Sequence, residues 1–156
     1  MEQTEKILIK KTDSRNLNKI IMFEKEDSQY IQQYDITEHV KVLENECHLS
    51  IFKKEDNKLI GHIILVGVTN RKKSIEFRRI VISEKGLGYG KDSIKLIKEI
   101  CFEKYKANKI WLDVYSENER AIKLYESQGF LKENIKQIKE DNNVRNLWIM
   151  SITHNS

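Results

Sequence analysis

Residues 83–91, SEKGLGYGK, contain three glycines at alternate positions, and these glycines separate a strand pattern from a helix pattern. Before them, residues 74–82 (SIEFRRIVI) alternate in polarity as a strand does, and after them apolar residues recur with helical spacing over residues 94–105. A further apolar run, residues 109–115 (KIWLDVY), reads as a strand. This order predicts a βαβ unit with parallel strands.

The glycine loop matches neither common nucleotide motif. A dinucleotide fingerprint needs glycines at relative positions 1, 3 and 6, and the third is missing whether counting starts at Gly86 or Gly88. A Walker loop needs Ser or Thr after its Gly-Lys pair, but Gly90-Lys91 is followed by Asp92. Glycines still allow a close approach to a ligand, and amides at a helix N-terminus attract anions, so the loop suits a pyrophosphate.

The rest of the chain predicts a single domain over residues 1–156. Helical pieces are expected within residues 14–45, where Thr37 is a candidate N-cap, and after Ser116, which opens a capping-box sequence with Glu119. Gly129 is placed to stop that last helix. Apolar alternation and turn residues predict strands at 6–11, 48–54, 59–68, 74–82, 109–115, 130–139 and 144–153.

Composition narrows the class of protein. The 156 residues are 39% hydrophobic and 33% charged with a net charge of +4, which is typical of a globular chain. No apolar run approaches a membrane span, and the N-terminus lacks the features of a signal peptide, so we expect a cytoplasmic protein without a membrane partner. Cys47 and Cys101, like the four histidines, lack the spacing of metal ligands, so no metal is expected and Cys101 is read as a buried thiol.

Charge is distributed unevenly along the chain. Residues 24–46 are rich in acids and residues 71–91 are rich in bases, so one region suits a cation and the other an anion. Ordinary solvated faces remain the alternative interpretation. Nucleic-acid binding is disfavoured, because the same bases suit the phosphates of a small ligand.

Two blocks of sequence together resemble the GNAT superfamily of acetyl-CoA-dependent N-acetyltransferases. The first is residues 85–90 (KGLGYG), with Lys85 where the family usually has Arg or Gln, and the second is residues 118–130 (NERAIKLYESQGF). The C-terminal hairpin, with Arg145 and residues 147–150 (LWIM), is similar to the branch of ribosomal-protein and spermidine acetyltransferases. The resemblance implies a mixed α/β fold with a mostly antiparallel, twisted sheet of six to seven strands, a central βαβ unit and flanking helices.

The resemblance also implies where acetyl-CoA would bind as cosubstrate. Amides of the glycine loop would hold the pyrophosphate, the backbone of residues 80–82 would pair with the pantetheine arm, and Asn118 would contact that arm. The alternative for Asn118 is a residue that only caps its own helix. The donor-binding residues implied are Ile80, Val81, Ile82, Lys85, Gly86, Leu87, Gly88, Tyr89, Gly90, Lys91, Asn118, Ala121 and Tyr125.

The implied reaction is direct attack of a primary amine on the thioester in a ternary complex. Tyr125 is the candidate general acid for the thiolate, because a phenol still carries its proton near neutral pH. Glu76 is the candidate base, expected on the same strand face as Arg78, Ile80 and Ile82; Asp113, Tyr115 or an ordered water are alternatives. The acidic stretch hints at a cationic small-molecule or peptide amine. A non-catalytic acyl-CoA sensor remains the second reading, and a monomer or homodimer is expected.

Overall fold

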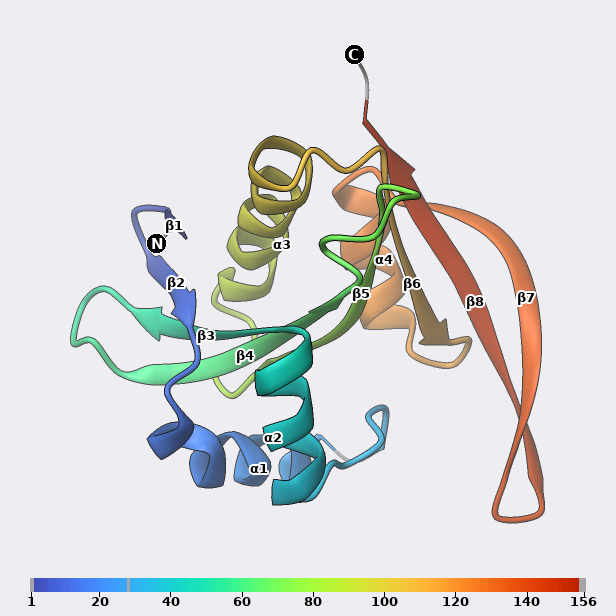
Figure 1. Ribbon diagram of the computed structural model, residues 1–156. Coiled ribbons are helices and arrows are strands. Elements are labelled where there is room, and N and C mark those ends of the chain that lie inside the picture. Colours follow the sequence, from blue (N-terminus) through green and yellow to red (C-terminus); the bar gives the residue numbers. More distant parts are fainter. Residues whose placement is uncertain (1, 28, 155–156) are drawn as a thin grey trace.

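The computed structural model describes residues 2–27 and 29–154, and its strands form one sheet in the order β1-β2-β3-β4-β5-β6-β8-β7 (Figure 1). All neighbouring strands are antiparallel except β5 and β6, which are parallel. The strands are β1 (Glu2–Gln3), β2 (Ile7–Lys11), β3 (Cys47–Lys53), β4 (Leu59–Val66), β5 (Ser74–Ile82), β6 (Lys109–Tyr115), β7 (Leu131–Glu140) and β8 (Asn143–Thr153).

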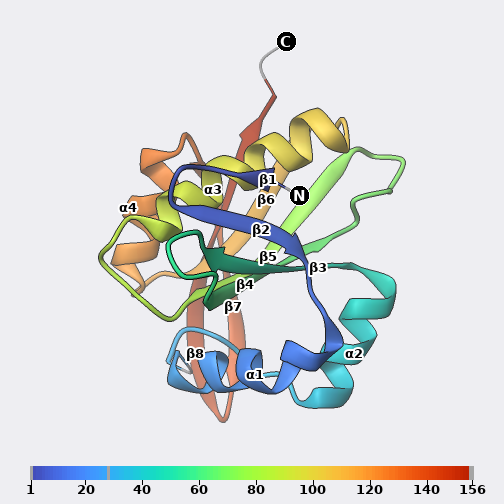
Figure 2. The same cartoon turned by 90° about the vertical axis from the view of Figure 1, so that its left-hand side faces the viewer.

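Helices cover both faces of the sheet (Figures 1 and 2). On one face, α1 contacts β4 and β5 while α2 contacts β3; on the other, α3 contacts β2, β5 and α4. No helix in the described part of the chain is long and apolar enough to cross a membrane. The helices are η1 (Ser14–Asn16), α1 (Leu17–Glu26), α2 (Ile36–Asn45), α3 (Tyr89–Glu99), its π-helical end η2 (Ile100–Lys104) and α4 (Glu119–Ser127).

A β-bulge at Arg78 changes which face of the sheet the later side chains of β5 join. Ile64 pairs with Arg79 and Leu65 with Phe77, so Arg78 is the extra residue in β5. The side-chain alternation therefore reverses: Phe77 packs with the α3 side, whereas Val81 packs with the α1 side. Without the extra residue, Val81 would share the α3 side with Phe77.

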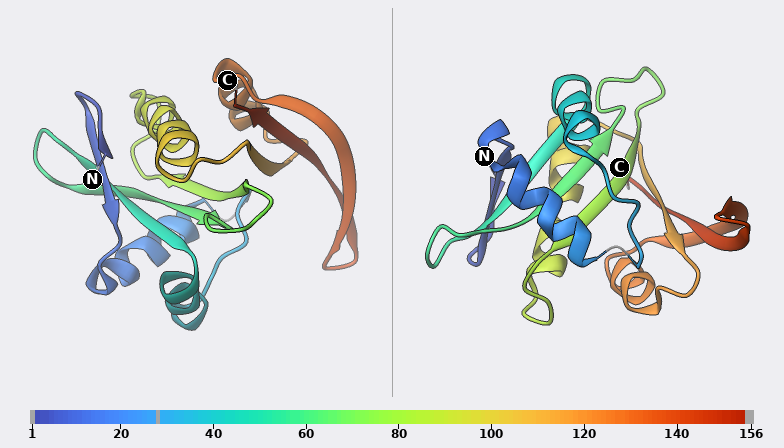
Figure 3. Two further views of the ribbon diagram at one scale, coloured as in Figure 1. Left: turned by 45° about the horizontal axis from the view of Figure 1, so that its top comes forward. Right: turned by 90° about the horizontal axis from the view of Figure 1, so that it is seen from below.

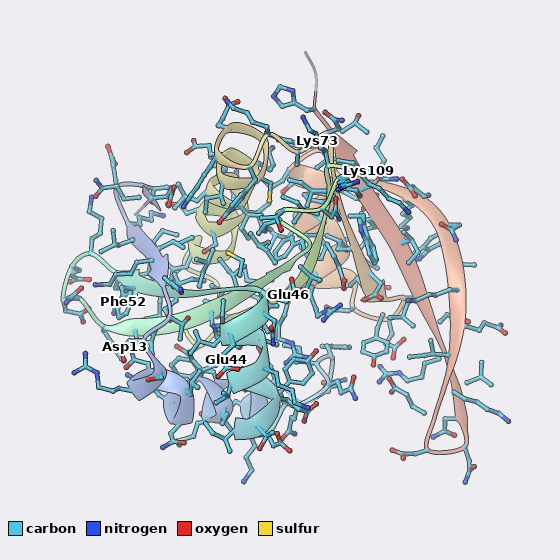
Figure 4. All side chains as sticks on the ribbon, in the orientation of Figure 1. Asp13, Glu44, Glu46, Phe52, Lys73 and Lys109 are labelled. Atoms are coloured by element: carbon cyan, nitrogen blue, oxygen red, sulfur yellow. The ribbon has the colours of Figure 1, made fainter. Side chains whose placement is uncertain are left out.

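Strands β5 and β6 separate soon after they begin. They pair only from Ser74 and Lys109 to Glu76 and Trp111, while β5 continues to Ile82 and β6 to Tyr115. Lys73 and Lys109 lie together where the strands start, in Figure 4. Beyond the divergence, β6 pairs with β8, and β7 and β8 form a long curved arm (Figure 3). The edge of β5 that faces β6 is therefore left without a strand partner over its second half.

Most predicted elements are confirmed, with local corrections. Within residues 2–27 and 29–154 the sheet has eight strands instead of six or seven, because β1 is a two-residue strand too short to show alternation. The N-cap of α2 is Asp35, which forms a capping box with Glu38, and not Thr37. The N-cap of α4 is Asn118, not Ser116. In each case the residue directly before the helix has the free oxygen that its first turn needs.

Candidate active site

A cleft of about 1140 Å³ opens where β5 and β6 diverge. Its walls are the glycine loop with α3, the start of α4, part of the segment that joins α1 to α2, and the β7–β8 arm. The size is that of a site for a large ligand. The structure brings together in this cleft nearly all the predicted donor-binding residues: Ile80, Ile82, Lys85, Gly86, Gly88, Tyr89, Gly90, Lys91, Asn118, Ala121 and Tyr125.

Two predicted residues lie elsewhere. The Val81 side chain is buried against α1, because the bulge at Arg78 turns it away from α3. Leu87 is 54% exposed at the tip of the glycine loop. Any role of these two residues in binding is limited to their backbone groups or, for Leu87, to a contact at the rim.

The glycine loop has the backbone shape that its sequence suggested. Gly86 and Gly88 have φ angles of 80° and 84°, in the left-handed region that other residues adopt at a cost. Gly88 is also the N-cap of α3, so the helix begins at the cleft wall with its first amides free of intrahelical partners. The sequence interpretation missed Lys6, whose Nζ donates to the carbonyl oxygen of Leu87 at 3.3 Å and adds a positive charge beside the loop.

The basic stretch of residues 71–91 does not form one patch. Lys73 lies at the start of β5, the opposite end of the strand from the glycine loop (Figure 4). Lys85 and Lys91 line the cleft, but Lys85 donates to Asp27 at 2.8 Å. Arg120 also lines the cleft, although sequence reasoning did not single it out. Positive charge at the donor end therefore comes from residues scattered in sequence.

Tyr125 lies on α4 with its ring between Phe77 and Phe130, at centroid distances of 5.9 Å to each. Its hydroxyl has no hydrogen-bond partner within residues 2–27 and 29–154, and the residue lines the cleft. Burial, and to a lesser degree the carboxylate of Asp113, raises the pKa of Tyr125 above its ordinary value of 10. The phenol therefore keeps its proton at neutral pH and is free to donate it to a bound group.

The candidate bases are all engaged by other side chains. Arg78 donates to both carboxylate oxygens of Glu76, at 2.8 and 3.0 Å. Lys136 donates to Asp113 at 2.9 Å. Tyr115 donates to Glu140, and burial followed by that hydrogen bond raises the pKa of Tyr115 to about 12. Each group reaches the cleft, yet none is an unpartnered carboxylate waiting for a proton.

The expected face of Glu76 needs correction. The alternation of β5 had placed it with Arg78, Ile80 and Ile82, but the bulge at Arg78 interrupts the period. Ile80 and Ile82 pack against the α3-side cluster, as Phe77 does. Glu76 lies on the opposite side from Phe77 and lines the cleft at the last pair of β5 and β6 before the strands diverge.

Asn118 has a structural task as well as a place in the cleft. Its side-chain oxygen accepts from the amide of Ala121 at 3.3 Å, which caps α4. Only the amide nitrogen of the side chain is then free to donate to a ligand. The alternative that the sequence left open, a residue that satisfies its own helix, is therefore at least partly right.

The acidic stretch of residues 24–46 is divided between three environments. Glu26 and Asp27 line the cleft. Glu38 belongs to the N-cap of α2, and Glu44 lies on α2, away from the β7–β8 arm (Figure 4). Glu24 is fully buried. Only a small part of this acidity therefore faces a ligand in the cleft.

Three of the four histidines are buried together, which sequence reasoning missed. Nε2 of His39 and of His62 lie 2.8 and 2.9 Å from the carboxylate of Glu24, and Nδ1 of His39 lies 3.1 Å from Nε2 of His48. His154 is exposed. Desolvation lowers the pKa of His48 from 6.5 to about 3 and also lowers that of His62, so both stay neutral near pH 7.

Comparison with known proteins agrees with the fold. Residues 13–130 match the family model described as the Acetyltransferase (GNAT) family. Spermidine N(1)-acetyltransferase of Vibrio cholerae serotype O1 is 31% identical over 84 residues, 53% of this chain and 49% of that protein. The match thus spans about half the length of this curated relative.

Solved structures superpose over most of the chain. The Vibrio cholerae spermidine N-acetyltransferase in complex with CoA and spermine has a TM-score of 0.83 and 21% identity, covering 96% of each chain. A GNAT-family acetyltransferase from Bacillus anthracis has a TM-score of 0.82 and 17% identity, covering 97% of this chain and 96% of that one. At 17–21% identity these structures establish the fold alone. The assignment to a family rests on the family model that matches residues 13–130. The chain belongs to the GNAT family of acetyltransferases.

Proposed function

We propose that this protein is an N-acetyltransferase that moves an acetyl group from acetyl-CoA to a primary amine by direct attack in a ternary complex. One observation carries the proposal: the glycine loop at the start of α3, the unpaired edge of β5 and Tyr125 all open into one cleft. Family membership and a curated relative that acetylates spermidine support the same reaction.

The donor would lie along the α3 side of the cleft. Amides from Gly86 to Lys91 would hold the pyrophosphate at the positive end of the helix dipole. The pantetheine arm would pair with the free edge of β5 at residues 80–82, as an added strand pairs with a sheet. Amides of the same edge would polarise the thioester carbonyl and stabilise the oxyanion.

Tyr125 would act as the general acid. The neutral amine attacks the carbonyl carbon, and the tetrahedral intermediate collapses by breaking the carbon–sulfur bond. Tyr125 gives its proton to the departing thiolate, which leaves as CoA thiol, and the tyrosinate regains a proton through water as the attacking nitrogen loses one. The ammonium proton of the attacking nitrogen would leave through ordered water, with Glu76 as the alternative base, because Arg78 already donates to both oxygens of Glu76.

The acceptor is proposed to be a cationic primary amine, with spermidine as the first candidate. Glu26, Asp27 and Glu76 line the cleft; Asp27 and Glu76 are paired with Lys85 and Arg78, and Glu26 adds a negative charge that would attract a polyamine. The family relatives named for spermidine motivate the same choice. A cytoplasmic location and a monomeric or homodimeric state stay predictions.

The test is release of CoA thiol from acetyl-CoA with a panel of polyamines, peptides and other amines. Turnover with spermidine above the rate without amine is the expected result. A non-catalytic acyl-CoA sensor is the second candidate, favoured by the absence of an unpartnered base among the carboxylates described above. Tight acetyl-CoA binding in calorimetry, with no thiol released by any amine, would favour that sensor and contradict the enzyme.

A further inference from the structure

The most unusual feature outside the proposed chemistry is a buried carboxylate. Glu24 is 0% exposed and its two oxygens accept four hydrogen bonds. Oε1 accepts from the amide of Tyr34 at 3.2 Å and from Nε2 of His39 at 2.8 Å. Oε2 accepts from Nε2 of His62 at 2.9 Å and from Nη1 of Arg79 at 2.5 Å. A buried charge with this many donors is strongly held in place.

The group has the residue types of a metal site but the geometry of an ion pair. Ligating atoms of Glu24, His39 and His62 lie within 4.8 Å of one another. A carboxylate only accepts hydrogen bonds, so each imidazole nitrogen that faces Glu24 carries a hydrogen and has no lone pair for a metal. The guanidinium of Arg79 supplies the positive charge that a buried carboxylate needs.

Arg79 links this buried group to the wall of the cleft. Its Nη2 donates to the carbonyl oxygen of Gln32 at 2.5 Å, and its guanidinium lies 4.0 Å from the ring centroid of Tyr34. Gln32 and Tyr34 both line the cleft, on the side away from α3. Glu24 also accepts from the backbone amide of Tyr34, so the wall is held from behind at three points.

Further contacts hold Glu24 and Tyr34 in place. The ring of Tyr34 meets the ring of His39 edge-on at 5.5 Å. For the neutral tautomers, the hydrogen bonds run in one direction, from Thr12 to His48 to His39 to Glu24. These hydrogen bonds run from the residue after β2 through β3 and α2 to α1, so the position of the wall depends on how these segments pack together.

We propose that Glu24 and Arg79 are positioning residues that fix the Gln32–Tyr34 wall and thereby set the affinity for the amine acceptor. The identity of that acceptor rests on the proposed function. The contacts of Glu24 and Arg79 with Gln32 and Tyr34, called the clamp below, are a property of the fold. Neither residue is assigned a part in the chemical step. Weakening the clamp therefore changes acceptor binding and leaves the donor end intact.

The test compares Arg79→Lys with Arg15→Lys, which alters an exposed Arg–Asp pair on η1. Lysine at 79 keeps the charge that Glu24 needs but cannot bond Glu24 and Gln32 together as the planar guanidinium does. With spermidine as probe, we expect the KM for spermidine to rise about tenfold, from loss of one charged hydrogen bond. The KM for acetyl-CoA and kcat should stay near wild type, and Arg15→Lys should change none of them.

Hydrogen–deuterium exchange gives a readout that needs no turnover. In Arg79→Lys, amides of residues 30–35 should exchange about tenfold faster while those of α3 keep their protection. Glu24→Gln should have the same local effect. In the double variant, amides of residues 30–35 should exchange no faster than in the single variant with the faster exchange. Unchanged exchange at residues 30–35, or a uniform increase across the protein, would overturn the clamp.

The two proposals fail in different ways. If wild-type protein turns over no amine, the proposed function fails, and exchange at residues 30–35 still decides the clamp. If spermidine is turned over and the KM for acetyl-CoA rises as much as that for spermidine, the positioning role is refuted, because the change would not be confined to the acceptor wall.

Discussion

Replacing Tyr125 with phenylalanine removes one oxygen from the cleft and should stop most of the chemistry without disturbing the fold. A general acid contributes roughly 10²–10⁴-fold to a rate, so kcat for Tyr125→Phe should fall by a factor in that range. The KM values for acetyl-CoA and amine should change little, because the proposed proton transfer takes place only as the thiolate leaves.

The expected effect on stability is close to zero. The Tyr125 hydroxyl has no hydrogen-bond partner among the residues that the structure describes, so its loss leaves no donor or acceptor unpaired. The ring contacts with Phe77 and Phe130 remain. The free energy of unfolding, measured with urea, should therefore lie within about 0.5 kcal/mol of wild type.

The assay is thiol release at saturating acetyl-CoA and amine, with calorimetric binding of CoA as a check on the site. Tyr105→Phe is the matched control, because Tyr105 follows η2 and packs against the core at a distance from the cleft. It should keep wild-type turnover. Undiminished kcat in Tyr125→Phe would refute the acid role, and a large loss of stability or CoA affinity would show that the hydroxyl has a structural or binding role instead of a catalytic one.

Three further changes test the loop, the core and the buried histidines. Gly88→Ala should cost about 1 kcal/mol in urea denaturation, because φ is 84° there, and calorimetry should show weaker CoA binding; unchanged affinity would exclude the loop from the donor site. Phe130→Ala should lower the free energy of unfolding by about 3–5 kcal/mol in the same assay, because Phe130 is fully buried. A decrease of less than about 0.5 kcal/mol, as for a surface residue, would contradict its place in the core. His48 and His62 stay neutral in the folded state, whereas in the unfolded state they take up protons below about pH 6.5. The free energy of unfolding should therefore decrease as the pH is lowered, by about 1.4 kcal/mol per pH unit for each histidine, and down to about pH 3 for His48. Urea denaturation from pH 7 to pH 4 measures that slope, and a flat profile would mean that the histidines are not buried as neutral groups.

Local patterns predicted the donor end of the cleft. The glycine loop, the start of α3 and the position of Tyr125 each depend on residues close in sequence, where spacing and capping rules apply. Gly88 has the positive φ that glycines in a tight loop suggest. Their meeting in one cleft required the family resemblance, because spacing alone does not bring α4 beside β5.

The histidine cluster could not be predicted in the same way. Glu24, His39, His48 and His62 lie on α1, α2, β3 and β4, and only tertiary packing brings them together. One signal was present: Glu24 lies in the helical stripe that contains Leu17 and buries its carboxylate on the apolar face of α1. A charge on such a face requires buried partners, and three histidines and an arginine were available to supply them.

The bulge at Arg78 is the other feature that the pattern concealed. Residues 74–82 alternate well enough to predict a regular strand, and the extra residue is visible only in the pairing with β4. It reverses which side chains face α1 and α3. For that reason Arg79 points to Glu24, while Glu76 does not share a face with Ile80.

In the proposed reaction, an acetyl group passes directly from acetyl-CoA to an amine bound beside Tyr125. Mass spectrometry of both amine and protein, after incubation with acetyl-CoA and spermidine, tests it in one reaction. We expect acetylated spermidine and unmodified protein, because direct transfer requires no covalent intermediate. An acetylated protein that forms without amine and then loses its acetyl group to spermidine would contradict direct transfer, and no acetylated product with any amine of the panel would contradict the enzyme.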